Sequence, residues 1–299
     1  MTISFKDKVA IVTGAGGGLG RAYALELARR GAKVVVNDLG AARDGTGHSD
    51  AALKVVEEIK AAGGEAMSDG GSVTDYDHMV AMVAKTKDAW GGVHILINNA
   101  GILRDKSFSK MPIEDFRLVV DVHLMGSANA TKAVWDLMRD QNYGRILMTA
   151  SSTGLYGNFG QANYGAAKLG VAGLAKTLYL EGAKNNVRVN TIVPVAGTRM
   201  TQDILPAQAF EAFAPENVVP AALYLVSEDA PSNAIIGAGA GAYHAAYVTM
   251  TPPIVLSPDE RTPEGIAAHW AEITDRSGEI VPQSGMEQSM AIVSKLQGN

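Results

Sequence analysis

The stretch Val9-Ala-Ile-Val-Thr-Gly-Ala-Gly-Gly-Gly-Leu-Gly-Arg21 decides how this chain folds. Its first part, Val9 to Thr13, has the length and apolar content of a strand that is buried on both faces. The glycines at 14, 18 and 20 allow a tight turn and a close approach to a pyrophosphate at the amino end of the next helix. The spacing is not the usual Gly-x-Gly-x-x-Gly, and a glycine-rich turn by itself is often an ordinary loop.

Strand-like and helix-like segments alternate along the chain. Further buried strands are expected at 33–37, 65–68, 94–97, 145–149 and 188–193. Helices are expected at 19–30, 50–62, 75–90, 112–139 and 164–184. This alternation predicts an α/β fold of the Rossmann type, a doubly wound parallel sheet with helices on both faces. We expect that domain to cover residues 1–256 and a helical C-terminal extension to cover 257–299.

Composition excludes several classes of function. With 299 residues, 47% hydrophobic content and a net charge of -5, the chain can bury a large core and carries no basic face for nucleic acid. No apolar run is long enough for a membrane span, and the N-terminus lacks a signal-peptide core. The absence of cysteine rules out disulfides, thiolate catalysis and cysteine-ligated zinc, and is compatible with the cytoplasmic location that we expect. The histidines are scattered, so we expect no metal site.

Asp38 follows the expected strand 33–37 directly. A carboxylate at this point can accept hydrogen bonds from both hydroxyls of an adenosine ribose, and it would repel a 2′-phosphate. Gly17 stands where a basic residue would assist such a phosphate. The pattern predicts NAD rather than NADP, although Asp38 could instead cap a turn.

Two polar segments follow other expected strands. The run Ile95-Leu-Ile-Asn98-Asn99-Ala100-Gly101 ends in amides that can tie strands together and in small residues that let a cofactor approach. Alternatively it is a plain turn.

The second segment contains Tyr164-Gly-Ala-Ala-Lys168, which is preceded by Ser151 at the end of an apolar run. Tyr164 and Lys168 project from one helix face. An ammonium beside a phenol would lower the pKa of the phenol towards neutrality, and a serine hydroxyl could hold the same oxygen. This trio suits alcohol/ketone redox chemistry, although such a pair alone is usually a half-buried tyrosine with a solvated lysine.

Together these motifs, with Pro194-x-x-Gly197-Thr198, resemble the short-chain dehydrogenase/reductase family in order and spacing. The resemblance implies that Ser151, Tyr164 and Lys168 are catalytic and that NAD is the cofactor. It also implies the following cofactor-binding residues: Gly14, Gly18, Leu19, Gly20, Asp38, Ser72, Val73, Asn99, Ala100, Gly101, Tyr164, Lys168, Pro194, Ala196, Gly197 and Thr198.

Within the family the chain resembles the (3R)-hydroxyacyl-CoA dehydrogenase branch, also called 17β-hydroxysteroid dehydrogenase type 4. The likeness is carried by Gly20-Arg-Ala-Tyr-Ala-Leu25, Val35-Val-Asn-Asp-Leu-Gly40, Asn98-Asn-Ala-Gly-Ile-Leu-Arg-Asp105 and Tyr156-Gly-Asn-Phe-Gly-Gln-Ala-Asn-Tyr164. It implies oxidation of a (3R)-3-hydroxyacyl-CoA in fatty-acid or sterol side-chain β-oxidation. Alternatives are a dehydrogenase of hydroxysteroids or other secondary alcohols and a non-catalytic NAD sensor. The ending Leu296-Gln-Gly-Asn299 lacks the branch's peroxisomal targeting signal.

The resemblance implies further structure beyond the core motifs. Gly237-Ala-Gly-Ala-Gly-Ala-Tyr243 resembles the last sheet strand and its turn, unless it is a flexible loop. In the extension we expect helices at 263–276 and 284–296.

Two positions depart from the family pattern. His123 stands where the family has a catalytic asparagine, and we interpret it as a packed helix residue whose backbone carbonyl could still hold a relay water. Gly71 replaces the usual aspartate of the adenine pocket, so adenine contacts would rely on Ser72, Val73 or a shifted Asp69.

The substrate side is less distinctive. Residues 197–217 are expected to form a mobile apolar lid with Met200, Ile204, Leu205, Phe210 and Phe213, or else an ordinary surface helix. Candidate partners for CoA phosphates are Arg104, Lys106, Lys110 and Arg199, which could also be solvated charges.

The helix that carries Tyr164 is apolar on nearly all sides. The apolar side chains on opposite sides of such a helix must both be buried, and the sheet can cover only one side. We expect a second copy of the chain on the other side, in a homodimer or a higher homo-oligomer.

Overall fold

The computed structural model describes residues 2–197 and 211–297. The chain divides into two compact units, Met1–Ala245 and Ala246–Asn299. The division therefore falls earlier than the boundary predicted between residues 256 and 257.

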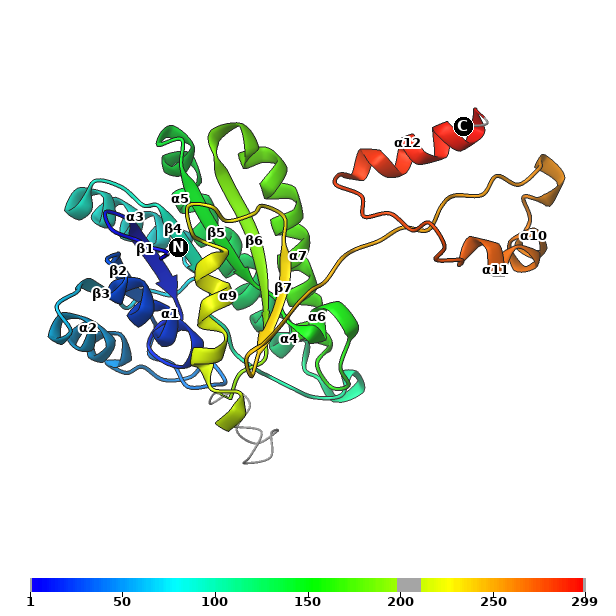
Figure 1. Cartoon of the computed structure of the whole chain (residues 1–299). Helices are drawn as coiled ribbons and strands as arrows, with labels where there is room; N and C mark the ends of the chain where they lie inside the picture. The colour runs from blue at the N-terminus through cyan, green and yellow to red at the C-terminus, as the bar shows by residue number, and fades with distance from the viewer. Residues whose placement is uncertain (1, 198–210, 298–299) are drawn as a thin grey trace. The chain divides into compact units, whose positions relative to one another are not determined.

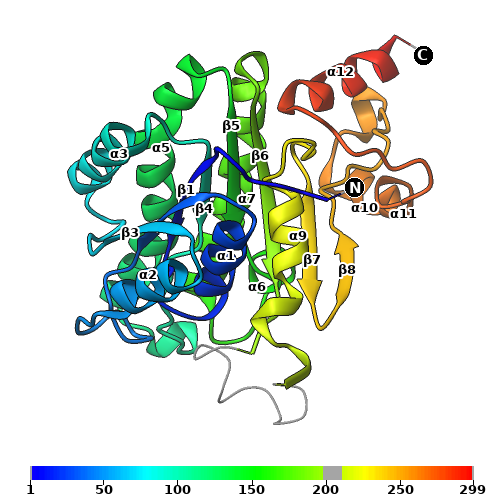
Figure 2. The same cartoon turned by 60° about the vertical axis from the view of Figure 1, so that its left-hand side comes forward.

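Within the described residues, the first unit contains a sheet of eight strands in the order β3-β2-β1-β4-β5-β6-β7-β8. Strands β1 to β7 are parallel, and β8 is antiparallel to β7 at one edge (Figure 2). The bounds are β1 Val9–Thr13, β2 Lys33–Asn37, β3 Glu65–Asp69, β4 Ile95–Asn98, β5 Gly144–Thr149, β6 Val187–Pro194, β7 Ile235–Gly239 and β8 Ala242–Ala245. The predicted doubly wound sheet is confirmed. The stretch 237–243, expected as one strand and a turn, is a hairpin of two strands.

Helices fill the crossovers between the parallel strands. They are α1 Gly18–Arg29, α2 Ala51–Ala61, α3 Tyr76–Trp90, α4 Ile113–Val120, α5 Gly126–Asp140, α6 Ser152–Tyr156, α7 Ala162–Gly182 and α9 Val219–Tyr224. Three short 3₁₀ turns lie at Phe108–Lys110, Ala183–Asn185 and Pro215–Asn217. The prediction of one continuous helix over 112–139 is wrong, because a π-helical turn at Asp121–Met125 separates α4 from α5. π-turns of this kind are often found at functional sites.

Helices cover both faces of the sheet (Figure 1), and the core consists of two clusters of buried side chains, one on each face. Ala10 and Val12 of β1 face a cluster that includes α1, α2 and α9, whereas Ile11 faces a cluster that includes α3, α5 and α7. Successive strand side chains point to opposite faces, so a strand covered on both sides must be apolar throughout. All five residues of β1 are buried accordingly.

The second unit contains a 3₁₀ turn at Pro258–Glu260 and the helices α10 Pro263–Ala268, α11 Trp270–Ile273 and α12 Gly285–Leu296. The helix predicted over 263–276 is divided at His269, whose backbone leaves the helical region (φ −97°, ψ 12°). None of the residues that the structure describes in this unit is fully buried, so they form no core of their own. No helix within 2–197 or 211–297 has both the length and the apolar content needed to cross a membrane.

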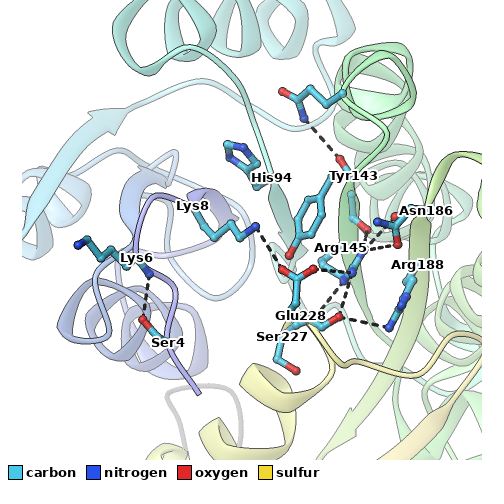
Figure 3. A network of polar contacts seen from close by, with 12 residues as sticks. Ser4, Lys6, Lys8, His94, Tyr143, Arg145, Asn186, Arg188, Ser227 and Glu228 are labelled. Carbon is cyan, nitrogen blue, oxygen red and sulfur yellow. Dashed lines mark hydrogen bonds and ion pairs between the residues drawn. The ribbon is translucent and has the colours of Figure 1, made fainter. Parts of the chain in front are cut away.

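A buried arginine ties the amino end of β5 to two neighbouring loops (Figure 3). The Arg145 side chain is fully buried, and its Nη1 donates to the carbonyls of Gly144 and Asn186 at 2.8 and 2.9 Å. Its Nε and Nη2 donate to the carbonyls of Ser227 and Glu228, both at 3.0 Å. Burial lowers the pKa of the guanidinium, but hydrogen bonds to four backbone carbonyls solvate its charge.

Replacing Arg145 by Met is expected to lower the free energy of unfolding by about 3 to 5 kcal/mol, because it leaves several buried carbonyls without donors. Urea unfolding followed by circular dichroism measures this loss. Arg29→Met is the matched control, since Arg29 pairs with Glu26 at an exposed position and should change stability little. A smaller loss for Arg145→Met than for the control would contradict this role.

Candidate active site

The crevice where a dinucleotide would lie opens at the carboxyl ends of β1 and β4, where the order of strands reverses. It has a volume of about 470 Å³ and lies between the turn after β1 and the segments that follow β2, β3 and β4. Nine of the predicted cofactor residues line it: Gly14, Gly18, Leu19, Asp38, Ser72, Val73, Asn99, Ala100 and Gly101. Residues 39–43 line it as well, together with Ile102, Leu118 and Val122, which the motifs did not indicate.

The remaining predicted cofactor residues lie elsewhere. Pro194, Ala196 and Gly197 are at the carboxyl end of β6, where the Gly197 N–H donates to the Phe213 carbonyl at 2.6 Å. Thr198 is outside the described residues, as is most of the predicted lid, including Met200, Ile204, Leu205 and Phe210.

The glycines of the turn after β1 leave space for a ligand that residues with a side chain would fill. Gly14 has a positive φ of +63°, and a Cβ there would lie 2.7 Å from the Ala100 Cα. A Cβ on Gly20 would lie 2.2 Å from the Gly14 carbonyl oxygen, so the turn requires a glycine here, and its predicted contact with the cofactor stays a prediction. Gly17, the N-cap of α1, provides no side-chain cap and has open space around it. The first amides of α1 are therefore free of a side-chain cap and suit an anionic group.

Asp38 is fixed by two backbone amides. Its Oδ2 accepts from Gly16 N and its Oδ1 accepts from Gly40 N, both at 2.7 Å. Each oxygen keeps a lone pair towards the crevice that could accept a ribose hydroxyl.

The adenine end of the crevice lacks a free carboxylate. Asp69 Oδ1 accepts from Asn37 Nδ2 at 2.6 Å and from Gly71 N at 3.0 Å, and His78 Nε2 lies 3.0 Å from Oδ2. A Cβ on Gly71 would lie 1.8 Å from the His78 ring, which explains the glycine at this position. Of the expected adenine contacts, Ser72 lines the crevice, whereas Asp69 is held by these neighbours.

The strands β1 and β4 are joined at the crevice floor by Thr13 and Asn99. The Thr13 hydroxyl accepts from the N–H groups of Asn99 and Ala100 at 3.0 and 3.1 Å. Asn99 Nδ2 donates to the carbonyls of Thr13 and Gly14, both at 3.1 Å. Thr13 is thus a site residue that the sequence motifs contained but did not single out.

The structure brings the catalytic candidates together. Ser151 follows β5 and is the N-cap of α6, where its Oγ accepts from Thr153 N at 3.2 Å. Tyr164 and Lys168 lie one turn apart on α7, and the Ser151 side chain is near enough to the Tyr164 phenol to lower its pKa. Lys168 is buried, and its Nζ donates to the Thr149 carbonyl at 2.6 Å and lies 5.6 Å from the Tyr164 ring centre.

The expectation that Lys168 lowers the pKa of Tyr164 towards neutrality is wrong for this arrangement. Burial raises the pKa of Tyr164 to about 12, against the opposing effect of the Ser151 hydrogen bond. Burial also lowers the pKa of Lys168 to about 7, because the ammonium has lost its water. Burial therefore dominates the pKa of both groups, and the Asp105 carboxylate raises the pKa of Tyr164 further.

His123 lies on the π-helical turn and is fully enclosed. Its Nε2 lies 3.2 Å from the Ile102 amide nitrogen and 2.8 Å from the Ile102 carbonyl, and its ring meets Tyr164 edge-on at 5.1 Å. Burial, followed by the nearby Lys168 charge, holds the pKa of His123 well below its usual range. The imidazole is therefore neutral at physiological pH. Its backbone carbonyl accepts from the Ser127 hydroxyl at 2.6 Å. The carbonyl oxygen has a second lone pair, so the relay water expected there stays a prediction.

The candidate cations for CoA phosphates differ in their surroundings. Arg104 is engaged within the protein, because its Nη1 donates to Asp115 Oδ1 at 2.8 Å and its Nε donates to the Asp44 carbonyl at 3.0 Å. Lys106 lies 3.8 Å from the same aspartate, and Arg199 is outside the described residues. Within 2–197 and 211–297, no cluster of three or more histidines and acidic residues could hold a metal ion.

Comparison with known proteins gives several matches. A family model described as short chain dehydrogenase matches residues 8–209. Peroxisomal multifunctional enzyme A of Dictyostelium discoideum is 47% identical over 98% of this chain, which spans 66% of that protein. Full-length peroxisomal multifunctional enzyme type 2 from Drosophila melanogaster superposes with a TM-score of 0.82 at 41% identity, over 99% of this chain and 50% of that one. The chain thus spans one half to two thirds of these relatives.

A second solved structure resembles the chain. It is 7α-hydroxysteroid dehydrogenase complexed with NADH and 7-oxoglycochenodeoxycholic acid, with a TM-score of 0.72 and 29% identity over 80% of this chain and 95% of that one.

Proposed function

Because this chain belongs to the short-chain dehydrogenase family, we propose that it is an NAD-dependent enzyme that oxidises the 3-hydroxyl of a (3R)-3-hydroxyacyl-CoA to a 3-oxoacyl-CoA. The observation that carries the chemistry is that α7 places the Tyr164 phenol near Ser151 and one turn from a buried Lys168. The observation that carries the substrate is the high identity with multifunctional enzymes over nearly all of this chain.

The residues of the crevice fit a dinucleotide. The uncapped amides at the start of α1 would hold the pyrophosphate, Asp38 would accept the ribose hydroxyls, and Ala100 and Gly101 leave room along the backbone. A bound oxidised nicotinamide ring would accept the hydride from C3 and bring a positive charge to the site.

The chain's own groups would handle the proton. Tyr164, ionised in the presence of positive charge, takes the proton of the substrate hydroxyl. Ser151 donates a hydrogen bond to the oxygen and so orients it. Lys168, held against the Thr149 carbonyl, supplies positive charge when it is protonated.

The substrate assignment has one alternative with its own support. The similarity to 7α-hydroxysteroid dehydrogenase favours a hydroxysteroid or another secondary alcohol. A catalytically silent NAD sensor has less support, since the Ser-Tyr-Lys trio is assembled. The compartment stays a prediction, because the expected cytoplasmic location differs from the peroxisomal names of the relatives.

Tyr164→Phe should lower turnover by about 10²- to 10⁴-fold while NAD still binds, because only the proton acceptor is lost. Formation of NADH is followed by absorbance with a (3R)-3-hydroxyacyl-CoA, its (3S) isomer and a 17β-hydroxysteroid. Tyr156→Phe is the matched control, a change at an exposed tyrosine of α6 that should leave turnover unaltered.

The result of this assay distinguishes the three candidate functions. Turnover with the (3R) ester supports the proposal, preference for the steroid supports the alternative, and NAD binding without turnover on any of them supports the sensor. Wild-type turnover by a folded Tyr164→Phe enzyme would remove Tyr164 from the mechanism.

We propose NAD rather than NADP as the cofactor on the basis of Asp38. Asp38→Asn keeps the size of the side chain but removes the charge that repels a 2′-phosphate, so the preference for NAD should fall about tenfold or more. The ratio of kcat/KM for the two cofactors measures it. Asp44→Asn, a change elsewhere in the same loop, is the control. An unchanged ratio in Asp38→Asn would argue against this role.

We propose that the chain forms a homodimer through α7. Leu169 and Leu180 of this helix are 50% and 47% exposed, and Gly173 has open space around it. Leu180→Glu should convert the dimer to a monomer, because a charge would be buried in the interface. Light scattering after size exclusion measures the mass, and Leu53→Glu on α2 is a control of similar exposure. A wild-type monomer, or a dimeric Leu180→Glu protein, would contradict the proposal.

A further inference from the structure

The segment 39–50, which we call the strap, joins β2 to α2 and forms one wall of the crevice. It is bonded to the segment after β4, part of which forms another wall. Leu103 N donates to the Arg43 carbonyl, and Arg104 Nε donates to the Asp44 carbonyl, both at 3.0 Å. These bonds connect the two walls and therefore limit how far the crevice can open.

Arg104 is the part of this connection that a side chain controls. Its guanidinium also makes an ion pair of 2.8 Å with Asp115 of α4, and the side chain of Asp115 is only 14% exposed. An arginine that bonds both to a backbone carbonyl and to a largely buried carboxylate anchors a loop more firmly than an exposed ion pair does. The strap is thereby fastened, through one arginine, to a helix of the core domain.

The main chain of the same residue reaches the catalytic helix. The Arg104 carbonyl accepts from Asn163 Nδ2 at 3.0 Å, and Asn163 Oδ1 accepts from the Tyr164 amide at 2.7 Å. Asn163 is completely buried, so both bonds are shielded from water. A displacement of Arg104 would therefore be transmitted through these two hydrogen bonds to the backbone of Tyr164.

The next residue makes a parallel connection to Ser151. Asp105 Oδ2 accepts from Gln161 Nε2 at 2.8 Å, and Gln161 Oε1 accepts from the Thr153 hydroxyl at 2.9 Å. Thr153 N in turn donates to the Ser151 hydroxyl at 3.2 Å. Arg104 and Asp105 together thus link the strap with both helices that carry the catalytic oxygens.

We propose that Arg104 is a positioning residue that couples closure of the strap beside the dinucleotide to the placement of Tyr164. The inference rests on the proposed function, since it concerns the same crevice and the same trio. With Arg104 in place, the strap keeps a fixed position beside the cofactor. The hydrogen bonds from Arg104 through Asn163 also fix the position of Tyr164. Without its guanidinium, the strap loses the bond at the Asp44 carbonyl and keeps the one at the Arg43 carbonyl, so the strap can open more readily and the start of α7 is held less firmly.

The test compares Arg104→Met with Lys106→Met in the full chain. Lys106 approaches the same Asp115, at 3.8 Å, but has no hydrogen bond to the strap among the described residues. Stopped-flow fluorescence measures NADH release, and a titration measures NADH affinity. Arg104→Met should release NADH about tenfold faster and bind it correspondingly more weakly, whereas Lys106→Met should stay within about twofold of wild type.

A second measurement tests the coupling itself. With enzyme saturated by NAD, a single-turnover experiment gives the rate of hydride transfer apart from cofactor release. Arg104→Met should slow this step about tenfold, because Tyr164 is less well placed. Asn163→Asp, which keeps the acceptor for the Tyr164 amide but loses the donor to Arg104, should slow the same step and leave NADH release unchanged.

The outcomes separate the two proposals. If the wild-type chain binds no NADH, the proposed function fails. If it binds NADH and Arg104→Met matches it in release and in hydride transfer, the positioning role is wrong. Faster release with unchanged hydride transfer overturns the coupling. Should Arg104→Met not fold, Asp115→Asn breaks the same ion pair and must show both effects.

Discussion

Hydrogen bonds between Thr13 and Asn99 join the carboxyl ends of β1 and β4. The strand order reverses between these two neighbouring strands. On one side of this junction the chain continues through β2 and β3, and on the other through β5 to β7. The crossover helices diverge there and leave a crevice that side chains do not fill. The Thr13 hydroxyl accepts from two amides and the Asn99 side chain donates to two carbonyls, so these backbone groups at the crevice floor have hydrogen-bond partners within the protein. The glycine turn after β1, Asp38 and the strap line the crevice around this floor.

Burial governs the charges around the catalytic oxygens. It raises the pKa of Tyr164 and lowers that of Lys168, so both groups tend towards their neutral forms. In a buried site of this kind an added charge shifts the pKa values of neighbouring groups strongly, because little water is present to screen the charge. The trio is therefore poorly suited to ionise by itself and well suited to ionise when a cation arrives. This dependence would link proton transfer to occupation of the neighbouring crevice.

The features that depend on local chemistry could be predicted from the sequence. The β-branched runs indicated the strands, the glycine spacing indicated the turn, and Tyr164 with Lys168 indicated one helix face. What could not be predicted depends on contacts between distant segments. Nothing in the residues around Asp69 shows that His78 occupies the space beside Gly71, and Arg104 looks like a free surface cation until Asp44 and Asp115 are placed around it. The π-helical turn was missed because its sequence continues a regular helical pattern.

His123 places a buried imidazole beside the tyrosine that we propose as the proton acceptor. Its Nε2 lies within hydrogen-bonding distance of both the amide and the carbonyl of Ile102, yet one ring nitrogen cannot donate and accept at once. In either neutral tautomer a buried polar group is left over, and Nδ1 has no partner in the part of the chain that the structure describes. Such a group costs about 1 to 3 kcal/mol. Protonation offers no relief, because the ring is dry and Lys168 is near. The contacts of the imidazole are with the Ile102 backbone and the edge of Tyr164. Gly101 leaves the space that the ring needs, since a Cβ there would lie 2.2 Å from the His123 ring.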